Sequence, residues 1–549
     1  MSEWRDMQQE LAARRVERRS FLKGAAALST LAMLETNSIA KALVGRYGPP
    51  EARAIDTIVV TLMENRSTDH FLGWMGSVID GVQEGFWNPA RLEAAGSACS
   101  SDPAHQFPIA DATPVPTYRL PGHCLGSDPD HGWTGSRIEF NGGAMNGFAH
   151  RSGADAMGYY LEDDVPLLGW LAKNYTTFSR YFSSVMGPTY PNRLYWLAGQ
   201  GGGYKGNTIP GPQVAGRTPA GFTDGDPEPD GHDWSSVFHQ LDYFGIPWTY
   251  YHHDLASVML FFNRVEENPG KVRFIGDYYA DAAAGILTPV VFLDPGFVTV
   301  GNDDHPARDI AFGQRYLYDT FMALAQSRHW YSPRTGKGSV YVVSYDEGGG
   351  FYDHVPPPRV TDRNRSDDHC EDWGRLGFRV PTVVASPFSR GPDNGGGPTG
   401  VVNQSLFDHT SILKFIQWRF GLGSLNDRAY PGTLGFENGL NLGSRDDAPE
   451  IGNLASVLDF ANPRPDLPSE PPQIPLHPEG IYCSPAQFPE ETGGENPLEP
   501  VPEIPLPPLA RPRIPEPVVP HAEWVALADR GFFGKYDYRE RAKHGVFRD

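Results

Sequence analysis

Short runs of apolar, mostly β-branched residues recur along the chain and alternate with stretches of helical periodicity. Such runs, bounded by turn signals, are typical of strands buried on both faces of a sheet. The predicted strands are residues 55–64, 289–294, 339–347 and 380–388. The predicted helices include residues 165–182, 313–327 and 407–422. Because parallel sheets are built from strands that alternate with helices, the sequence predicts an α/β fold with a mainly parallel sheet flanked by helices.

The regions between these elements indicate how the chain is divided. Residues 99–160 and 200–240 are rich in Gly, Pro and Asp, which predicts long loop excursions from the sheet. From residue 462 the chain is dense in proline, which favours an extended or polyproline conformation. We therefore expect a main domain at residues 43–461 and a proline-rich C-terminal extension at 462–549 that packs on the body.

The first 42 residues have the pattern of an export signal. The stretch "RRSFLKGAAALSTLAML" (18–34) joins a twin arginine to an apolar run that is too short to span a bilayer. This pattern resembles a twin-arginine (Tat) signal, and "AKA" at 40–42 is a suitable cleavage site. The alternative is a basic amphipathic helix. We expect the Tat export machinery as a partner, a periplasmic or secreted location, and no integral membrane segment in the mature chain.

Charge narrows the range of partners. The 549 residues carry 46 Lys and Arg against 67 Asp and Glu, a formal net charge of −21. This balance argues against nucleic acid or an anionic membrane as a partner, because both select basic patches.

The four cysteines permit up to two disulfides in an exported chain. Their spacing favours Cys99–Cys124 within one loop region and Cys370–Cys483 between the tail and the body, with free buried thiols as the alternative. The sequence has no CxxC pair that would indicate a zinc site.

Acidic side chains stand at the carboxyl ends of two predicted strands, where open α/β sheets place their ligands. One strand ends in Asp346-Glu347, followed by three glycines, and another ends in Glu64-Asn65. These oxygen donors suit a metal ion, and Asn65 also suits a phosphoryl oxygen. For the second strand the alternative is a turn with a helix cap at Ser67 or Asp69.

A hydroxyl and several histidines complete the candidate chemistry. Thr189 stands in "GPTYPNRLYW" before a predicted helix, either as a nucleophile or as a simple N-cap. Five histidines lie in polar, turn-like contexts, where the alternative for each is a hydrogen-bonded or surface residue. They are His131, His252, His253, His305 and His354.

Together these motifs resemble a known family. They are "MENRSTDHFLGW", "DPDHGW", "FNGGAMNGF", "GPTYPNRLYWLAG", "NDDHP", "VSYDEGGGFYDHVPPP", "LGFRVPTVVASPFSRG" and "NQSLFDHTSILKFI". In order and character they are similar to the bacterial phosphoesterases that include phosphatidylcholine-type phospholipases C and related acid phosphatases. The resemblance covers residues 55–421 and implies an alkaline-phosphatase-like fold.

The resemblance also implies site roles. Glu64, Asn65, Asp346 and Glu347, together with the nucleophile Thr189, match the ligands of one divalent ion, which would be Mg²⁺, Mn²⁺, Ca²⁺ or Zn²⁺. His131 and His305 match positions that contact the phosphoryl group or protonate the leaving group. The His252-His253 pair resembles the acid-phosphatase branch, and His354 is placed beside the substrate.

The implied reaction is hydrolysis of a phosphate ester or phospholipid through a phosphothreonine intermediate. If a protonated histidine is the acid, activity should fall above neutral pH. The choice between phosphomonoesters and phosphodiesters stays open at this point. The same fold also occurs in sulfatases, but this chain has no "CxPxR" sequence, which formylglycine-forming sulfatases need. The remaining alternative is an exported binding protein that keeps the fold without catalysis.

Overall fold

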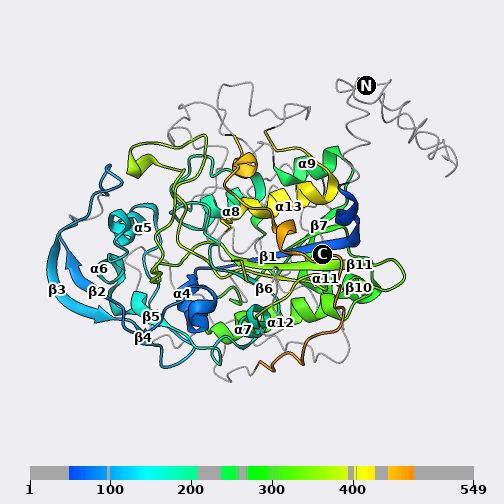
Figure 1. The fold of residues 1–549 in the computed structure, drawn as a ribbon, viewed down its shortest axis with the longest axis horizontal. Helices are drawn as coiled ribbons and strands as arrows, with labels where there is room; N and C mark the ends of the chain where they lie inside the picture. Colours follow the sequence, from blue (N-terminus) through cyan, green and yellow to red (C-terminus); the bar gives the residue numbers. More distant parts are fainter. Residues whose placement is uncertain are drawn as a thin grey trace, which may run out of the picture.

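The computed structural model describes most of the chain between Gly48 and Ile474 (Figure 1). The described residues are 48–94, 99–125, 127–207, 236–254, 256–258, 268, 270–297, 301–306, 308–392, 401–402, 405–426 and 443–474. The predicted signal at 1–42 and the extension beyond residue 474 lie outside them.

A single large sheet forms the centre of the molecule. Its nine strands follow the order β13-β6-β12-β11-β1-β9-β7-β8, with β10 paired to β11. The bounds are β1 (Ile55–Met63), β6 (Thr176–Phe178), β7 (Trp248–His252), β8 (Val272–Phe274), β9 (Val290–Asp294), β10 (Tyr331–Ser332), β11 (Lys337–Tyr345), β12 (Val383–Ala385) and β13 (Val401–Val402). The run from β11 through β1, β9 and β7 to β8 is parallel throughout.

The strand at the middle of this sheet is β1, and its sequence explains its position. Seven consecutive residues from Thr57 to Met63 are fully buried, so the strand needs neighbours on both edges and cover on both faces. Val60 pairs with Val342 of β11 on one side and with Phe292 of β9 on the other. The expected mainly parallel sheet is therefore confirmed for these strands.

The strand predicted at 380–388 differs from that expectation. It is only three residues long as β12 and pairs antiparallel with both β11 and β6. The prediction that it is parallel was wrong, because an apolar run reports burial but carries no information about strand direction.

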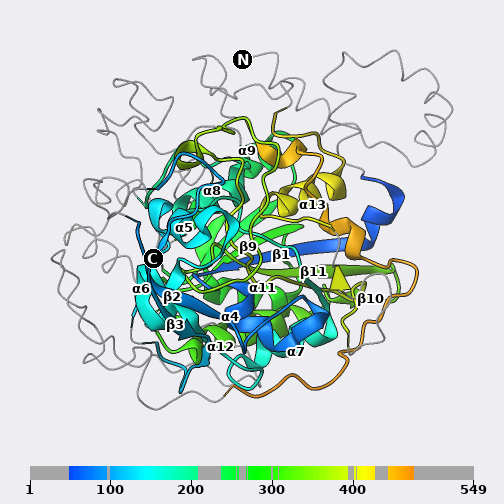
Figure 2. The same ribbon diagram turned by 60° about the vertical axis from the view of Figure 1, so that its left-hand side comes forward.

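Helices cover both faces of the sheet (Figure 2). Helices α8, α9 and α13 lie together on one face, and α7, α11 and α12 lie together on the other. Their bounds are α7 (Pro166–Asn174), α8 (Thr189–Ala198), α9 (Val237–Tyr243), α11 (Ile275–Ala284), α12 (Ile310–Ala325) and α13 (Thr410–Phe420).

The helix predicted at 165–182 is wrong in its second half. Helix α7 ends at Asn174, and Thr176–Phe178 then form strand β6. The β-branched pair Thr176-Thr177 favours a strand, and each pairs with a valine of β12.

The chain between β1 and α7, which includes the excursion predicted at residues 99–160, contains short elements at one end of the sheet. They are α4 (Thr68–Leu72), a two-stranded ribbon of β2 (Trp87–Leu92) and β3 (Ile109–Pro116), the pair β4 (Tyr118–Arg119) and β5 (Gly158–Tyr159), and helices α5 (Trp133–Phe140) and α6 (Phe148–Ser152). The ribbon is at the left edge of Figure 1.

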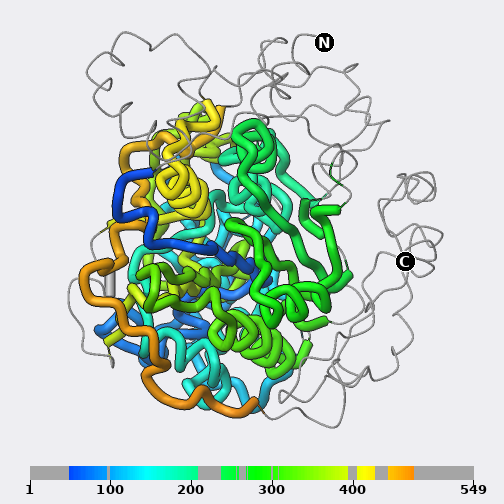
Figure 3. Tube along the Cα trace, turned by 90° about the vertical axis from the view of Figure 1, so that its right-hand side faces the viewer, coloured from blue at the N-terminus to red at the C-terminus, as the bar shows by residue number. Residues whose placement is uncertain are grey.

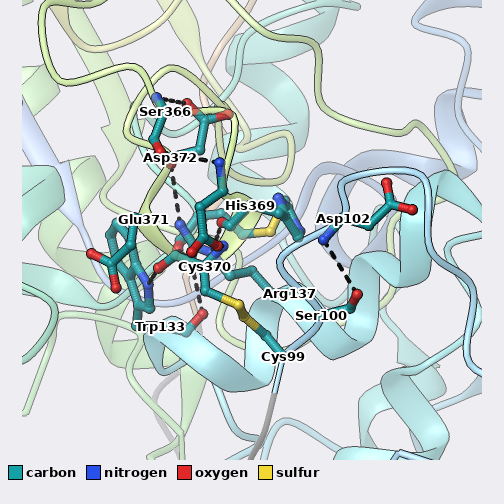
Figure 4. The surroundings of a disulfide bond; sticks show 12 residues. Cys99, Ser100, Asp102, Trp133, Arg137, Ser366, His369, Cys370, Glu371 and Asp372 are labelled. Carbon is teal, nitrogen blue, oxygen red and sulfur yellow. Dashed lines mark hydrogen bonds between the residues drawn. A yellow bond between two sulfur atoms is a disulfide. The ribbon is translucent and has the colours of Figure 1, made fainter.

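A disulfide ties this excursion to a distant loop (Figure 4). Cys99 is bonded to Cys370, 271 residues further along the chain, with the two Cα atoms 6.1 Å apart. Both predicted pairs were therefore wrong, because sequence spacing does not reveal which loops the fold brings together. Cys124 is also disulfide-bonded, whereas Cys483 lies outside the described residues.

Residues 462–474 run over the outer surface of the domain (Figure 3). The indole N–H groups of Trp330 and Trp170 donate hydrogen bonds to Pro465 O and Ser469 Oγ, both at 2.7 Å. Ile474 is buried against the core. In the part of the chain described above, no helix combines the length and the apolar character needed to cross a membrane.

Candidate functional site

The site lies where β1 and β11 end side by side. These strands pair in parallel, with Met63 opposite Tyr345, so the residues that follow each strand meet at one edge of the sheet. Glu64 and Asn65 follow β1, and Asp346 and Glu347 follow β11. All four side chains are almost completely buried.

The Asp346 side chain connects these two turns through hydrogen bonds from backbone N–H groups. Asp346 Oδ1 accepts the N–H of Asn65 at 3.1 Å and the N–H of Glu347 at 2.8 Å. Asn65 has a φ of +58°, a conformation that asparagine adopts more readily than most residues. A Cβ on Gly349 would lie 2.2 Å from Asn65 O, so this glycine permits close contact between the turns.

Thr189 is the first residue of α8 and points toward this edge of the sheet. Its hydroxyl donates a hydrogen bond of 3.4 Å to Glu64 Oε2. The N-cap of α8 is Pro188, so the alternative that Thr189 is a simple cap is wrong. Thr189 is 8% exposed, and its hydroxyl lies beside the Glu64 carboxylate.

Arg193 is a site residue that the sequence analysis missed. Its guanidinium donates to Glu64 Oε1 at 3.0 Å from Nε and 2.5 Å from Nη2, and Nε lies 3.5 Å from Asp346 Oδ2. It stands four residues after Thr189 on α8, and residues at that spacing share a helix face. That spacing was the available signal.

Burial in a group of like charges raises the pKa of each carboxyl group. Desolvation, followed by the charge of Asp346, raises the pKa of Glu64 to about 8. Desolvation also raises the pKa of Asp346 to about 6, against the opposing charge of Arg193. For Glu347 desolvation raises the pKa to about 7. Each shift measures how unfavourable the anionic form is without further positive charge.

Three buried oxygens at these strand ends have no hydrogen-bond partner. They are Asn65 Oδ1, Asp346 Oδ2 and Glu347 Oε1. Buried polar atoms normally have partners, so unpaired oxygens beside acidic groups fit an oxygen-preferring cation. Asn65, Asp346 and Glu347 belong to the predicted ligand set, although Glu64, Asp346 and Glu347 are not among the described sets of three side chains that lie close enough to share one ion.

The predicted histidines His131 and His305 lie together beside Glu347. Their rings are 5.8 Å apart, and His131 Nε2 lies 3.9 Å from Glu347 Oε1 and 3.4 Å from Asn65 Nδ2. Burial lowers the pKa of His131, but the charges of Glu347 and Asp128 outweigh it and raise the pKa to about 10. Asp128, missed in the sequence, is 3.7 Å from His131 Nδ1 and 3.9 Å from His305 Nε2.

His252 and His253 occupy a different part of the same edge. His252 is the last residue of β7, which is separated from β1 by β9, and His253 follows it. His252 Nδ1 lies 2.7 Å from Asp254 O, and His253 Nδ1 lies 3.4 Å from Asn302 Nδ2. Desolvation lowers both pKa values to about 4, so both rings are neutral at pH 7.

His354 belongs to a buried ion-pair cluster. Its Nδ1 lies 2.7 Å from Asp69 Oδ2, and Arg379 joins Asp69 to Asp353 at 3.0 and 2.9 Å. Ser67 is the N-cap of α4 and accepts the His70 N–H, as one of the alternatives predicted.

Among the residues that the structure describes, two sets of three side chains are each close enough to bind one metal ion together. They are Asp128, His131 and His305, and Asp69, Asp353 and His354. The second set already holds the guanidinium of Arg379.

A buried, largely parallel sheet with acidic and hydroxyl groups at its carboxyl edge defines an α/β enzyme. Residues 55–423 match the model of the Phosphoesterase family, and the chain belongs to this family. This confirms the resemblance drawn from the motifs, and the chain is a hydrolase that acts on phosphate esters.

Relatives from two kingdoms support the assignment. Phospholipase C A of Mycobacterium tuberculosis is 30% identical over 516 residues, covering 82% of this chain and 88% of that protein. Non-specific phospholipase C1 of Arabidopsis thaliana is 29% identical over 421 residues, covering 72% and 73%.

Similarity to solved structures is weaker. A protein of the alkaline phosphatase superfamily from Vibrio parahaemolyticus has a TM-score of 0.30 at 8% identity, covering 71% of this chain and 76% of that one. The lipoteichoic acid synthase LtaP of Listeria monocytogenes has a TM-score of 0.31 at 8% identity, covering 69% and 77%.

Proposed function

We propose that the chain is an exported, metal-dependent phosphoesterase of the phospholipase C type that uses Thr189 as a covalent nucleophile. The observation that supports this most directly is the hydrogen bond from Thr189 Oγ1 to Glu64 Oε2. It sets a hydroxyl at the start of a helix against a buried carboxylate, next to Asn65, Asp346 and Glu347, each of which has a buried oxygen without a hydrogen-bond partner. The twin-arginine pattern supports export, and its residues lie outside the described part.

The cation would be held by Glu64, Asn65, Asp346 and Glu347 together with Thr189. Bound there, a divalent ion supplies positive charge to the nucleophile and to the phosphoryl oxygens. The oxygen donors suit Mg²⁺, Mn²⁺ or Ca²⁺ and also admit Zn²⁺.

The side chains have the following roles in the proposed reaction. Thr189 Oγ1 passes its proton to Glu64 Oε2, to which it is hydrogen-bonded, and forms a bond to phosphorus while the bond from phosphorus to the leaving alcohol oxygen breaks. Asn65 contacts a phosphoryl oxygen, and His131 or His305 gives its proton to the alcohol. Water then gives a proton to that histidine and attacks phosphorus, the bond from phosphorus to Thr189 Oγ1 breaks, and Oγ1 recovers its proton from Glu64.

Phosphodiester substrates are favoured because the relatives reported above are named phospholipases C. The acid-phosphatase alternative rested on the His252-His253 pair. Both rings are buried, and desolvation lowers their pKa values to about 4, which does not suit an acid at neutral pH. We therefore assign them no step in the reaction, and we assign His354 to its ion-pair cluster.

Two variants at one position test the nucleophile. Thr189→Ala should reduce turnover of p-nitrophenylphosphorylcholine by several orders of magnitude, while Thr189→Ser should keep measurable turnover because it retains a hydroxyl. After rapid acid quenching of a reaction with this substrate, wild type should carry phosphorylcholine on residue 189, because only the p-nitrophenol has left phosphorus. A folded, fully active Thr189→Ala protein would contradict covalent catalysis.

The substrate class and the metal are tested with the same protein. Phosphorylcholine ester should be preferred over p-nitrophenyl phosphate, and the reverse preference would indicate a phosphatase. Prolonged chelation should abolish turnover, and one of the four candidate ions should restore it. A folded, metal-loaded protein without activity on either ester would favour a binding protein on this fold.

A further inference from the structure

We propose that Arg193 is a positioning residue: a fixed internal cation that holds Glu64 and Asp346 together and turns Glu64 toward Thr189. The proposal rests on the cation site proposed above and concerns a side chain to which no role has been given. Arg193 stands one turn after Thr189 on α8, so one short helix supplies both groups.

The guanidinium is held by protein on all its nitrogens. Besides Glu64, its Nη1 donates to Ser257 Oγ at 3.0 Å and to Asp294 Oδ1 at 3.4 Å, and Nη2 donates to Leu62 O at 3.2 Å. Its side chain is 2% exposed and lies over the Phe297 ring, 4.6 Å from the centroid. A guanidinium with these partners has no free edge for a phosphate, which distinguishes it from a substrate clamp.

The contacts with Glu64 set the orientation of that carboxylate. Arg193 binds Oε1 through two nitrogens, whereas Oε2 accepts the Thr189 hydroxyl. One oxygen is thus fixed by the guanidinium and the other faces the nucleophile. A lysine in place of Arg193 would keep the charge but would lose this two-point hold.

The charge of Arg193 is its second contribution. The guanidinium contacts three buried carboxyl groups, those of Glu64, Asp346 and Asp294. Asp294 also accepts hydrogen bonds from the Tyr250 hydroxyl and the Ser257 N–H. Without Arg193, the carboxylates would attract a divalent ion more strongly but would repel each other in its absence.

The experiment compares Arg193→Met and Arg193→Lys with wild type in full-length protein. Mn²⁺ binding is measured by calorimetry, and thermal unfolding is measured in chelator and in excess Mn²⁺. Arg193→Met should bind Mn²⁺ several-fold more tightly, unfold at a lower temperature in chelator and recover most of that loss with Mn²⁺. Its kcat should fall at least tenfold with little change in KM.

Arg193→Lys separates charge from orientation. Its unfolding temperature in chelator and its Mn²⁺ affinity should be closer to those of wild type than those of Arg193→Met are. Its kcat should stay low. Arg445→Met is the matched control, since Arg445 is another buried arginine between two aspartates, Asp362 and Asp408. It should lower the unfolding temperature in both conditions and leave Mn²⁺ affinity unchanged.

Two results would overturn the proposal. One is an Arg193→Met protein with wild-type stability in chelator and wild-type Mn²⁺ affinity. The other is a raised KM with weaker inhibition by inorganic phosphate, which would make Arg193 a substrate-binding residue. Failure of the proposed function has a different signature, because wild type itself would then bind no Mn²⁺, and the comparison in chelator would still test Arg193.

Discussion

The backbone N–H of Asn65 donates a 3.1 Å hydrogen bond to Asp346 Oδ1, and this bond joins the end of β1 to the end of β11. Asp346 therefore has two functions in one side chain. Oδ1 organises the turns through two N–H groups, whereas Oδ2 has no hydrogen-bond partner.

Asp346→Asn separates these functions. The amide oxygen still accepts both N–H bonds, so the fold should survive, and removal of a buried carboxyl whose pKa is raised to about 6 should not destabilise the metal-free protein. Turnover should fall by about two orders of magnitude or more, as for the loss of one key electrostatic group. The measurements are kcat and unfolding temperature with and without Mn²⁺. Full activity would contradict a ligand role for Asp346.

A pH dependence of stability follows from His354. Burial lowers the pKa of this ring, but the hydrogen bond and charge of Asp69 raise it above 6.5 overall. A folded pKa above the unfolded value gives stability that is present below about pH 6.5 and is lost as the pH rises through the folded value.

His354→Gln should therefore destabilise the protein more at about pH 6 than at about pH 9. The charged groups that face His354 are Asp69, Asp80, Asp353 and Arg379, and all are the same in both proteins. Urea unfolding at the two pH values measures the difference. A loss of stability that is equal at both would show that His354 is not charged in the folded state.

Arg379 should be one of the most sensitive positions for stability. It is fully buried and pairs with Asp69 and Asp353, so Arg379→Met leaves two buried carboxylates without their cation. The expected loss is roughly 3–5 kcal/mol of unfolding free energy. Arg119→Met is the control, because its pair with Asp164 is half exposed, and exposed pairs contribute at most about 1 kcal/mol. Similar losses for the two variants would contradict this ranking.

The Cys99–Cys370 bond should contribute to stability with little effect on chemistry. The double variant Cys99→Ser/Cys370→Ser should lose about 2–4 kcal/mol, since a cross-link mainly restricts the unfolded chain. The Cys370 loop also holds α5, because Cys370 O accepts the Trp133 indole N–H at 2.8 Å and His369 O accepts Arg137 Nε at 2.9 Å (Figure 4).

Helix α5 starts two residues after His131. The same variant should therefore inactivate at a lower temperature than wild type, but at temperatures well below that point its turnover should be near normal. Thermal inactivation curves check this, and thiol titration confirms that Cys124 is unaffected. A large loss of kcat at low temperature would instead show that the bond positions His131 directly.

The sequence predicted the positions of side chains best where they directly follow a strand. Glu64 and Asn65, and Asp346 and Glu347, were expected at strand ends because each pair follows an apolar run, and the structure brings these ends together. Thr189 was expected at a helix start and is the first residue of α8. These predictions of position needed the ends of single elements.

The missed features depend on the order of the strands. Asp294 ends β9, and it meets Arg193 only because β9 lies next to β1. Asp128 reaches His305 across a loop, and Cys99 reaches Cys370 across most of the domain. No local sequence pattern encodes these contacts, which form only when distant segments pack together in the folded domain.

The position of β1 has a consequence for how the protein is made. This strand leaves the ribosome before the other strands of the sheet, yet both its neighbours, β9 and β11, come from residues 290–294 and 337–345. A central strand whose partners are synthesised so late stays exposed during translation, and long-range pairing of this kind is slow. A chaperone that shields residues 55–63 until residue 345 has emerged would therefore raise the yield of folded enzyme, and nascent chains stalled before that point should be readily degraded by protease.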